Sequence, residues 1–410
     1  MRIHAIPTSI GLSLPSVKAE PISLPLTRGY VPLTLDGQAL NFRVDSSSAR
    51  TFAIYGPMYE DRHGKGSCDE IPSKCYFCPT NVSCDDIYTR ERWEVSFADG
   101  DEVEYVQHNV TLSFGGKVVP DFELGLIVEF DNIYGIEMTM YGLLGLSGGR
   151  SNIPETFLEQ LKRRRVISDL VYSIHAEEQG PSITGSLTLD DSRLTENLAI
   201  PFCCHLNISR KKIVVPLSSL RLLDSQRNVS PQHDWKVLGR AEHGPRPGEI
   251  DSGASSIQIS EEDFGTFVRA LETAMQRDNL DTNHIIWVDS KTQFNMIRAE
   301  AIPYLPTLGY VVGEPPHDMN IRIEPKHYIF GCDENTCFLD INDDFPGEPT
   351  LGQPLFRAYD VKVDISRCRV YFSPHAEISK TFAKARPYQP HGRLRSLVRR
   401  LLKKRGTRLS

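Results

Sequence analysis

The chain has 410 residues, of which 40% are hydrophobic and 24% charged, enough to bury one large core or two cores of ordinary domain size. This composition excludes disorder over most of the length, and no apolar run approaches the roughly 20 residues that span a bilayer. The net charge is −7, but from Ser379 onward there are 11 Lys/Arg and no acid, which leaves 35 bases against 53 acids before it. An acidic body argues against a nucleic-acid-binding core.

Strand patterns dominate from about residue 20 to 130. The segments "GYVPLTLDG", "LNFRVDS" and "FELGLIVEF" alternate apolar and polar residues between Gly-rich turns. Helical spacing occurs over 153–166 and 260–279, the second opening with Ser260 and Asp263 in an arrangement similar to a capping box. Strands then return to about residue 374. The pattern predicts an all-β, mainly antiparallel protein with a few short helices.

The nine cysteines fall into clusters, and the first holds Cys68, Cys75, Cys78 and Cys84. Structural zinc is one interpretation, but there is one CxxC and no second knuckle, so two disulfides that fasten a surface loop are favoured. Sequons at Asn81, Asn109, Asn207 and Asn228 weakly support a secreted glycoprotein. Together these features indicate the secretory pathway, ending outside the cell or in a vacuolar or lysosomal type of compartment. The first 20 residues, however, contain no clear signal peptide.

An internal repeat gives the strongest indication of architecture. An Asp-Ser turn in "FRVDSSSARTF" (42–52) is followed about a hundred residues later by "YGLLGLS" (141–147). A second Asp-Ser turn, in "GEIDSGASSI" (248–257), is followed after a similar gap by "PTLGQPLF" (349–356). A lone Asp-Ser after a strand is usually a turn cap, but two in register within a repeat indicate duplicated β lobes that face each other.

These residues resemble the pepsin-like aspartic peptidases over roughly residues 20 to 375. The two Asp motifs, the hairpin "WEVSFADG" (93–100) as a flap, and the two segments that close the active-site loops occur in the family's order. The resemblance implies a bilobal pepsin-like acid protease fold with the substrate cleft between the lobes. The expected boundaries are an N-terminal extension (1–19), an N-terminal lobe (20–198), a C-terminal lobe (199–376) and a basic tail (377–410).

The resemblance makes Asp45 and Asp251 the catalytic dyad. Peptide hydrolysis by this route needs two carboxyl groups that share one proton, so that one activates a water and the other protonates the scissile carbonyl oxygen; the aspartic-protease dyad is the best-known example of such coupled carboxyl groups. It needs no metal or organic cofactor. The residues expected to support the dyad are Ser46, Ser47, Ser48, Ser252, Gly253 and Ala254, with Ser46 and Ser252 cross-linking the two loops beneath the site.

Three departures from the family pattern bear on activity. Ser47 stands where the family has glycine. Serine keeps the backbone N–H donor, but the sequence does not decide whether that N–H still points at the aspartate. Phe97 and Phe52 replace the Tyr and Trp that hydrogen-bond at the flap, which suggests an apolar contact in their place. Arg43 and Glu249 each precede an aspartate by two residues and replace apolar cleft residues, so either a salt bridge beside the dyad or two solvated charges would fit.

The basic tail, "GRLRSLVRRLLKKRGTRLS", has apolar residues at helical spacing with Lys and Arg on the other face. This is a basic amphipathic helix or a solvated end, and its candidate partners are an anionic membrane surface or an acidic protein.

Two functions follow from the whole sequence. The first is an aspartic endopeptidase, expected as a monomer, that acts on extended peptides or proteins paired with the flap near Ala98, Asp99 and Gly100. The second is a catalytically impaired pepsin-fold protein that binds peptides or a protein partner.

Overall fold

A computed structural model describes the chain in segments. The described residues are 20–80, 82–97, 100–132, 140–149, 153–177, 180, 182–191, 199–202, 212–223, 237–240, 246–290, 294–343 and 348–375. The expected tail and N-terminal extension, Ala98, Asp99, and three of the four sequons lie outside them. Asn109, the remaining sequon, is exposed on a strand. No helix in these segments is long and apolar enough to cross a membrane.

The first half of the chain contributes a mixed sheet of seven described strands in the order β2-β3-β8-β4-β7-β6-β5. Their bounds are β2 Tyr30–Leu35, β3 Gln38–Asp45, β4 Phe52–Ile54, β5 Arg92–Ser96, β6 Asp101–Phe114, β7 Lys117–Asn132 and β8 Gly142–Gly145. The long hairpin of β6 and β7 contributes many core residues. Most of β6 alternates between buried and more exposed residues, as period-2 strands do, and β7 adds a run of five buried residues at 124–128.

The second half builds two further sheets. Nine described strands form one of them: β12 Val214–Leu217, β13 Arg221–Leu223, β14 Val237–Arg240, β15 Arg246–Ile250, β16 Ile257–Gln258, β19 Thr307–Glu314, β20 His317–Ile323, β23 Ile341–Asn342 and β24 Thr350–Leu351. Four described strands form the other: β17 Ile286–Val288, β18 Asn295–Arg298, β21 Ile329–Cys332 and β22 Thr336–Leu339.

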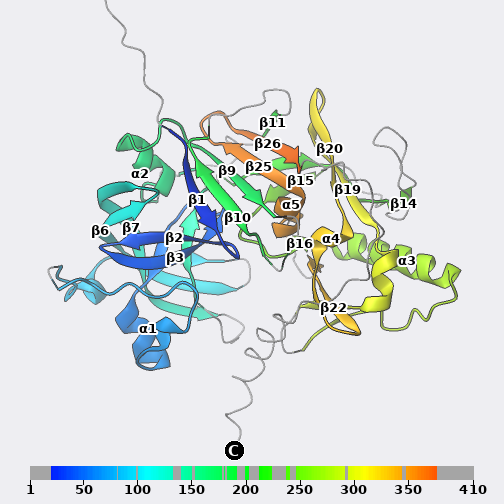
Figure 1. Ribbon diagram of the computed structural model, residues 1–410, viewed down its shortest axis with the longest axis horizontal. Helices are drawn as coiled ribbons and strands as arrows, with labels where there is room; N and C mark the ends of the chain where they lie inside the picture. Colours follow the sequence, from blue (N-terminus) through cyan, green and yellow to red (C-terminus); the bar gives the residue numbers. More distant parts are fainter. Residues whose placement is uncertain are drawn as a thin grey trace, which may run out of the picture.

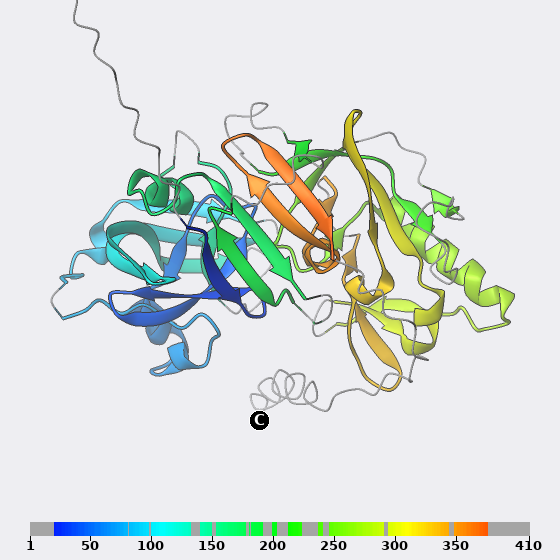
Figure 2. The same ribbon diagram turned by 45° about the horizontal axis from the view of Figure 1, so that its top comes forward.

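A sheet of six described strands joins the two halves, in the order β1-β10-β9-β25-β26-β11. Its strands are β1 Ile22–Leu26, β9 Val171–Ala176, β10 Gly185–Leu189, β11 Ala199–Pro201, β25 Tyr359–Asp364 and β26 Arg369–Pro374. Figures 1 and 2 show it between the blue-to-cyan strands of the first half and the yellow strands of the second. The expected mainly antiparallel β architecture is confirmed.

Helices are few and short in the described segments. They are α1 Gly56–His63, α2 Phe157–Arg163, α3 Glu261–Arg277, α4 Pro325–Tyr328 and α5 Gln353–Ala358, with 3-10 turns at Ser67–Asp69, Ile87–Thr89 and Ala299–Tyr304. Both predicted helices are present, and the Ser260 hydroxyl caps α3 by accepting from the Asp263 N–H at 3.2 Å. Helix α1, which has a proline in its first turn, was not predicted because its residues lack a helical pattern.

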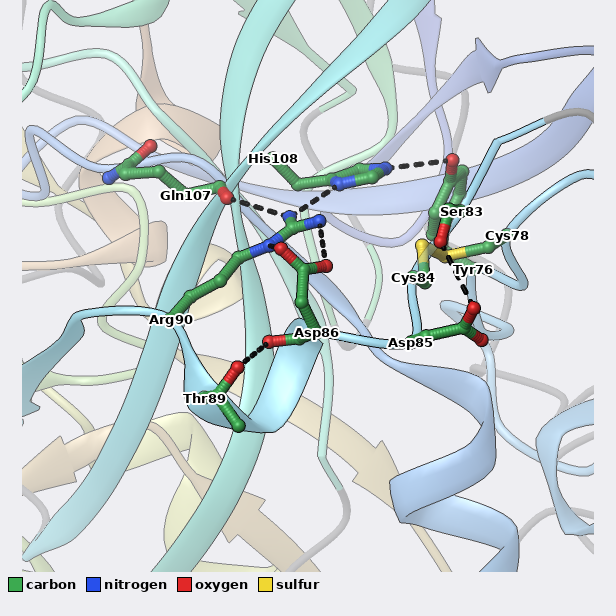
Figure 3. A network of polar contacts seen from close by, with 10 residues as sticks. All are labelled: Tyr76, Cys78, Ser83, Cys84, Asp85, Asp86, Thr89, Arg90, Gln107 and His108. Carbon is green, nitrogen blue, oxygen red and sulfur yellow. Dashed lines mark hydrogen bonds and ion pairs between the residues drawn. A yellow bond between two sulfur atoms is a disulfide. The ribbon is translucent and has the colours of Figure 1, made fainter.

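The first cysteine cluster forms two disulfides, Cys68–Cys75 and Cys78–Cys84, as the sequence favoured. A third joins Cys332 to Cys337. Beside the Cys78–Cys84 bridge, Figure 3 shows a polar network around the buried His108. Arg90 donates to His108 Nδ1 at 3.1 Å and is held by Asp86 at 2.7 Å, so His108 Nε2 carries the proton and faces the Tyr76 hydroxyl at 3.2 Å.

Candidate active site

The two Asp motifs occupy equivalent places in the two halves. Strand β3 ends at Asp45 and runs parallel to β8, with Asp45 opposite Gly145. Strand β15 leads directly into Asp251 and runs parallel to β24, with Ile250 opposite Leu351. The repeat seen in the sequence is therefore a structural repeat, in which each aspartate leaves the end of a strand beside the segment that closes its loop.

The Ser46 and Ser252 side chains join the two loops. The Ser46 hydroxyl accepts from the Ser252 N–H at 2.9 Å and donates to the Ile250 carbonyl at 3.1 Å. The Ser252 hydroxyl reciprocates, accepting from the Ser46 N–H at 3.0 Å and donating to the Val44 carbonyl at 3.1 Å. Both serines are fully buried. These four hydrogen bonds fix the separation of the two aspartates because they bind the backbone on either side of each.

Backbone N–H groups orient the two carboxylates. Asp45 Oδ1 accepts from the Ser47 N–H at 2.7 Å and from the Ser48 N–H at 2.9 Å, and Asp251 Oδ1 accepts from the Gly253 N–H at 2.7 Å. Ala254, the last residue of the second motif, uses its carbonyl to accept from the Gln353 N–H at 2.9 Å, which ties this loop to α5.

Gly253 lies where the two carboxyl groups meet. A Cβ on Gly253 would stand 2.8 Å from Asp45 Cγ and 3.0 Å from Asp251 Oδ1. Real Cβ atoms do not approach neighbours so closely, so this position requires glycine for space rather than for backbone angle. Carboxyl groups from two loops about 200 residues apart in sequence thus converge on one α-carbon.

The surroundings of the two carboxyl groups affect their pKa values differently. Burial raises the pKa of Asp251 well above its usual range, and the negative charges of Asp45 and Glu249 raise it further. Burial also raises the pKa of Asp45, but the two N–H donors and the charges of Arg43 and Lys212 oppose that rise. The pair therefore favours one proton, held mainly by Asp251, and titrates as a unit.

Ser47 keeps an N–H that donates to the dyad. Its φ is not positive, and its N–H points at Asp45 as described above. The backbone strain allowed for in the sequence analysis is absent at this residue. Its hydroxyl donates a hydrogen bond to the Glu249 carboxylate of the other motif.

The salt bridge suggested for Arg43 and Glu249 is wrong. Glu249 pairs instead with Lys212, whose Nζ lies 2.7 Å from Glu249 Oε1. The Arg43 guanidinium donates to the Gly253 carbonyl and lies over the Tyr141 ring, 4.7 Å from its centroid. The two charges are thus neither paired with each other nor solvated, because each has found a separate partner within the site.

Phe52 makes its ring contact with Tyr105, and the contact expected between Phe52 and Phe97 stays a prediction. Phe52 packs edge-on against Tyr105, with ring centroids 4.7 Å apart, and the Tyr105 hydroxyl accepts from Arg50 Nε at 3.0 Å. Phe97 is partly buried against the core at the end of β5. Its N–H donates to the Asp101 carbonyl at 2.7 Å, and Gly100 takes a positive φ of 85°, as the tip of a hairpin requires.

Sequence reasoning missed three residues of this site. Lys212 and Tyr141 hold Glu249 and Arg43, and Tyr172 is a buried phenol near Ser46 and the dyad. Burial raises the pKa of Tyr172, as do the charges of Asp45 and Asp251, so the phenol is neutral. Lys212 reaches Glu249 through the pairing of β12 with β15, which sets Val214 opposite Glu249, and the sequence has no local signal for this long-range contact.

Comparison with known proteins agrees with this geometry. The family model "Eukaryotic aspartyl protease" matches residues 61–375, a span that includes Asp251 and begins after Asp45. The chain belongs to the eukaryotic aspartyl protease family. Among solved structures, the crystal structure of an aspartic proteinase from Irpex lacteus superposes with a TM-score of 0.59 at 14% identity, and the match covers 88% of this chain and 99% of that one. A search of curated proteins gives no match.

Membership of the aspartyl protease family implies peptide substrates. Its pepsin-like members are typically secreted or vacuolar, and the three described disulfides fit such an oxidising compartment. At 14% identity, the similarity to the Irpex lacteus enzyme shows a shared fold and nothing further.

Proposed function

We propose that the protein is an aspartic endopeptidase that hydrolyses peptide bonds with a water activated between Asp45 and Asp251. The observation that carries the proposal is the convergence of both carboxyl groups on Gly253, where an added Cβ would lie 2.8 Å from Asp45 Cγ and 3.0 Å from Asp251 Oδ1. Two carboxyl groups this close share a proton, which is what the reaction requires.

The protonation states divide the work between the two groups. Asp45, held by two N–H donors, is the carboxylate that takes a proton from the attacking water. Asp251 is the acid that protonates the scissile carbonyl oxygen, since its pKa is raised by burial and by its acidic neighbours. The substrate is an extended peptide held in strand-like pairing under the flap, with Ser46, Ser252 and the motif backbone keeping the dyad in place.

Digestion of a peptide library between pH 3 and 6 tests this proposal. We expect cleavage that a statine-type transition-state mimic blocks and that Asp45→Asn and Asp251→Asn each reduce by about 10³-fold or more. An intact, folded protein that cleaves nothing across this pH range would refute it.

A peptide-binding protein without catalysis is the second candidate. It is favoured by the charged network at the dyad, in which Ser47 replaces the family's glycine, Glu249 replaces an apolar cleft residue, and both are bonded in a chain that ends at Lys212. Calorimetry separates the two functions: a binder takes up the statine peptide without turnover of any library member, and it does so equally well after Asp251→Asn.

We further propose that the protein passes through the secretory pathway as a glycoprotein and works as a monomer. The exposed sequon at Asn109 and the disulfides support the route. A mass decrease on treatment of the secreted protein with an amide-cleaving glycosidase, lost in Asn109→Gln if that site is used, tests glycosylation. Sedimentation tests the monomer.

A further inference from the structure

Two histidines and an aspartate meet on the joining sheet. Strands β9 and β25 pair antiparallel, and the pairing reaches Ile174 opposite Val361. His175 and Asp360, the next residues outward, therefore come opposite each other. Asp360 is also paired with Ser373 of β26, and His375 follows directly after that strand. Three adjacent strands thus deliver the three side chains to one place.

The three side chains converge on one carboxylate oxygen. His175 Nδ1 lies 2.5 Å from Asp360 Oδ1, and His375 Nδ1 lies 3.4 Å from the same atom. The imidazole rings stand edge to face with centroids 5.5 Å apart. One ligand atom from each residue can be chosen so that all lie within 4.8 Å of one another. In addition, His375 Nε2 is buried and has no hydrogen-bond partner among the described residues.

This donor set has the chemistry of a transition-metal site. Imidazole nitrogen and carboxylate oxygen are ligands that Zn²⁺ accepts, at about 2.0–2.2 Å. Ligand atoms around a tetrahedral ion at that range are about 3.3 Å apart, which the His375–Asp360 separation of 3.4 Å already matches. The His175–Asp360 contact has to open by about 0.8 Å to reach that spacing.

The exposure of each side chain fits such an adjustment. The His175 side chain is 59% exposed and can rotate outward, whereas His375 is only 10% exposed and is fixed by its surroundings. Asp360, at 39% exposure, leaves an approach from solvent for the ion. The site would offer three protein ligands and an open position for water.

We propose that His175, Asp360 and His375 bind a divalent transition-metal cation of the Zn²⁺ class at the junction of the two halves of the chain. The ion would clip β9, from the first half, to β25 and the end of β26, from the second. It is separate from peptide hydrolysis, which involves the dyad alone.

Titration of the metal-free full-length protein at pH 7.5 tests the proposal. Co²⁺, whose visible absorption reports its coordination, should bind with one equivalent and be displaced by Zn²⁺. His175→Ala, His375→Ala and Asp360→Asn should each weaken Co²⁺ binding by about tenfold or more. His317→Ala, which removes an exposed histidine from β20, should bind as the parent does.

Thermal unfolding gives a second readout that does not depend on absorption. Zn²⁺ should raise the Tm of the parent and of His317→Ala but not that of the His175→Ala/His375→Ala double variant, because only the native site binds the ion. The absence of a Co²⁺ spectrum, or equal Co²⁺ uptake by the parent and the double variant, would overturn the proposal and leave a hydrogen-bonded His-Asp-His cluster.

Discussion

The Ser47 hydroxyl donates a hydrogen bond to the Glu249 carboxylate, across the two loops that carry the dyad. Both residues depart from the family pattern, and the two departures are bonded to each other. Lys212 completes the arrangement by pairing with the same carboxylate at 2.7 Å. A third carboxyl group therefore lies beside the dyad without being left unpaired, which a buried charge could not tolerate.

Glu249→Gln should shift the alkaline limit of activity to lower pH. Glu249 raises the pKa of Asp251, so its neutralisation makes Asp251 lose its proton earlier as pH rises. Lys212→Met should move the limit the opposite way, because Lys212 lowers the pKa of both dyad residues. The profile of kcat/KM against pH measures both variants. Shifts in the same direction would contradict this electrostatic account.

Ser47→Ala should lower the free energy of unfolding by about 1–2 kcal/mol, since it removes a hydrogen bond to a largely buried carboxylate. The matched control is Ser96→Ala, because Ser96 donates to Glu102 at 3.3 Å in an exposed pair. We expect that change to stay within about 0.5 kcal/mol. Chemical denaturation gives both values, and equal losses would show that burial at Ser47 has no effect.

Ser46→Ala should cost about 2–4 kcal/mol of stability, because the Ser252 N–H and the Ile250 carbonyl both lose their partner in a fully buried place. Ser48→Ala is the control in the same loop. Its hydroxyl makes only long contacts of 3.3 and 3.5 Å with Arg50, so we expect less than about 1 kcal/mol. Urea unfolding with the reverse ranking would be inconsistent with a structural cross-link.

Gly253→Ala should reduce kcat by about 100-fold or more while the protein stays folded, since the new Cβ pushes Asp45 out of place by a fraction of an ångström or more. Gly265→Ala, inside α3, is the control. There the nearest atom to a new Cβ is the flexible end of Arg269, so activity should be unchanged and stability slightly higher. Full activity of Gly253→Ala would place the reacting groups elsewhere.

His108 should make the protein lose stability as pH falls. Burial lowers its pKa, as does Arg90, so the native protein holds it neutral in the network of Figure 3. In the unfolded chain, His108 takes up a proton as the pH falls through the ordinary imidazole pKa. Below that pKa, the free energy of unfolding decreases by up to about 1.4 kcal/mol per pH unit. His108→Gln should flatten the fall in unfolding free energy between pH 7 and 5, whereas His317→Gln should leave it intact. A slope unchanged by His108→Gln would mean that other groups cause the acid loss.

The features that could be predicted from the sequence are those marked by short motifs that occur once in each half of the chain. Asp45 and Asp251 were recognisable because Asp45 ends a strand, Asp251 directly follows one, both precede small residues, and the closing segments repeat at matching distances. The partners of the added charges were not recognisable. Opposite signs at matching places suggested an Arg43–Glu249 bridge, but Lys212 reaches Glu249 through the pairing of β12 with β15, a long-range contact with no local signal. Phe52 likewise packs on Tyr105, which belongs to a strand about 50 residues away.

The sheet that joins the two halves has a consequence for the folding of the newly synthesised protein. β9 is bordered on one side by β25, which begins at Tyr359. During synthesis, the first half therefore emerges with an open edge on β9 that only the last strands can cover. The nascent chain must stay protected from strand-to-strand aggregation until nearly all of it has been made, and a product cut short before residue 359 would carry that exposed edge permanently.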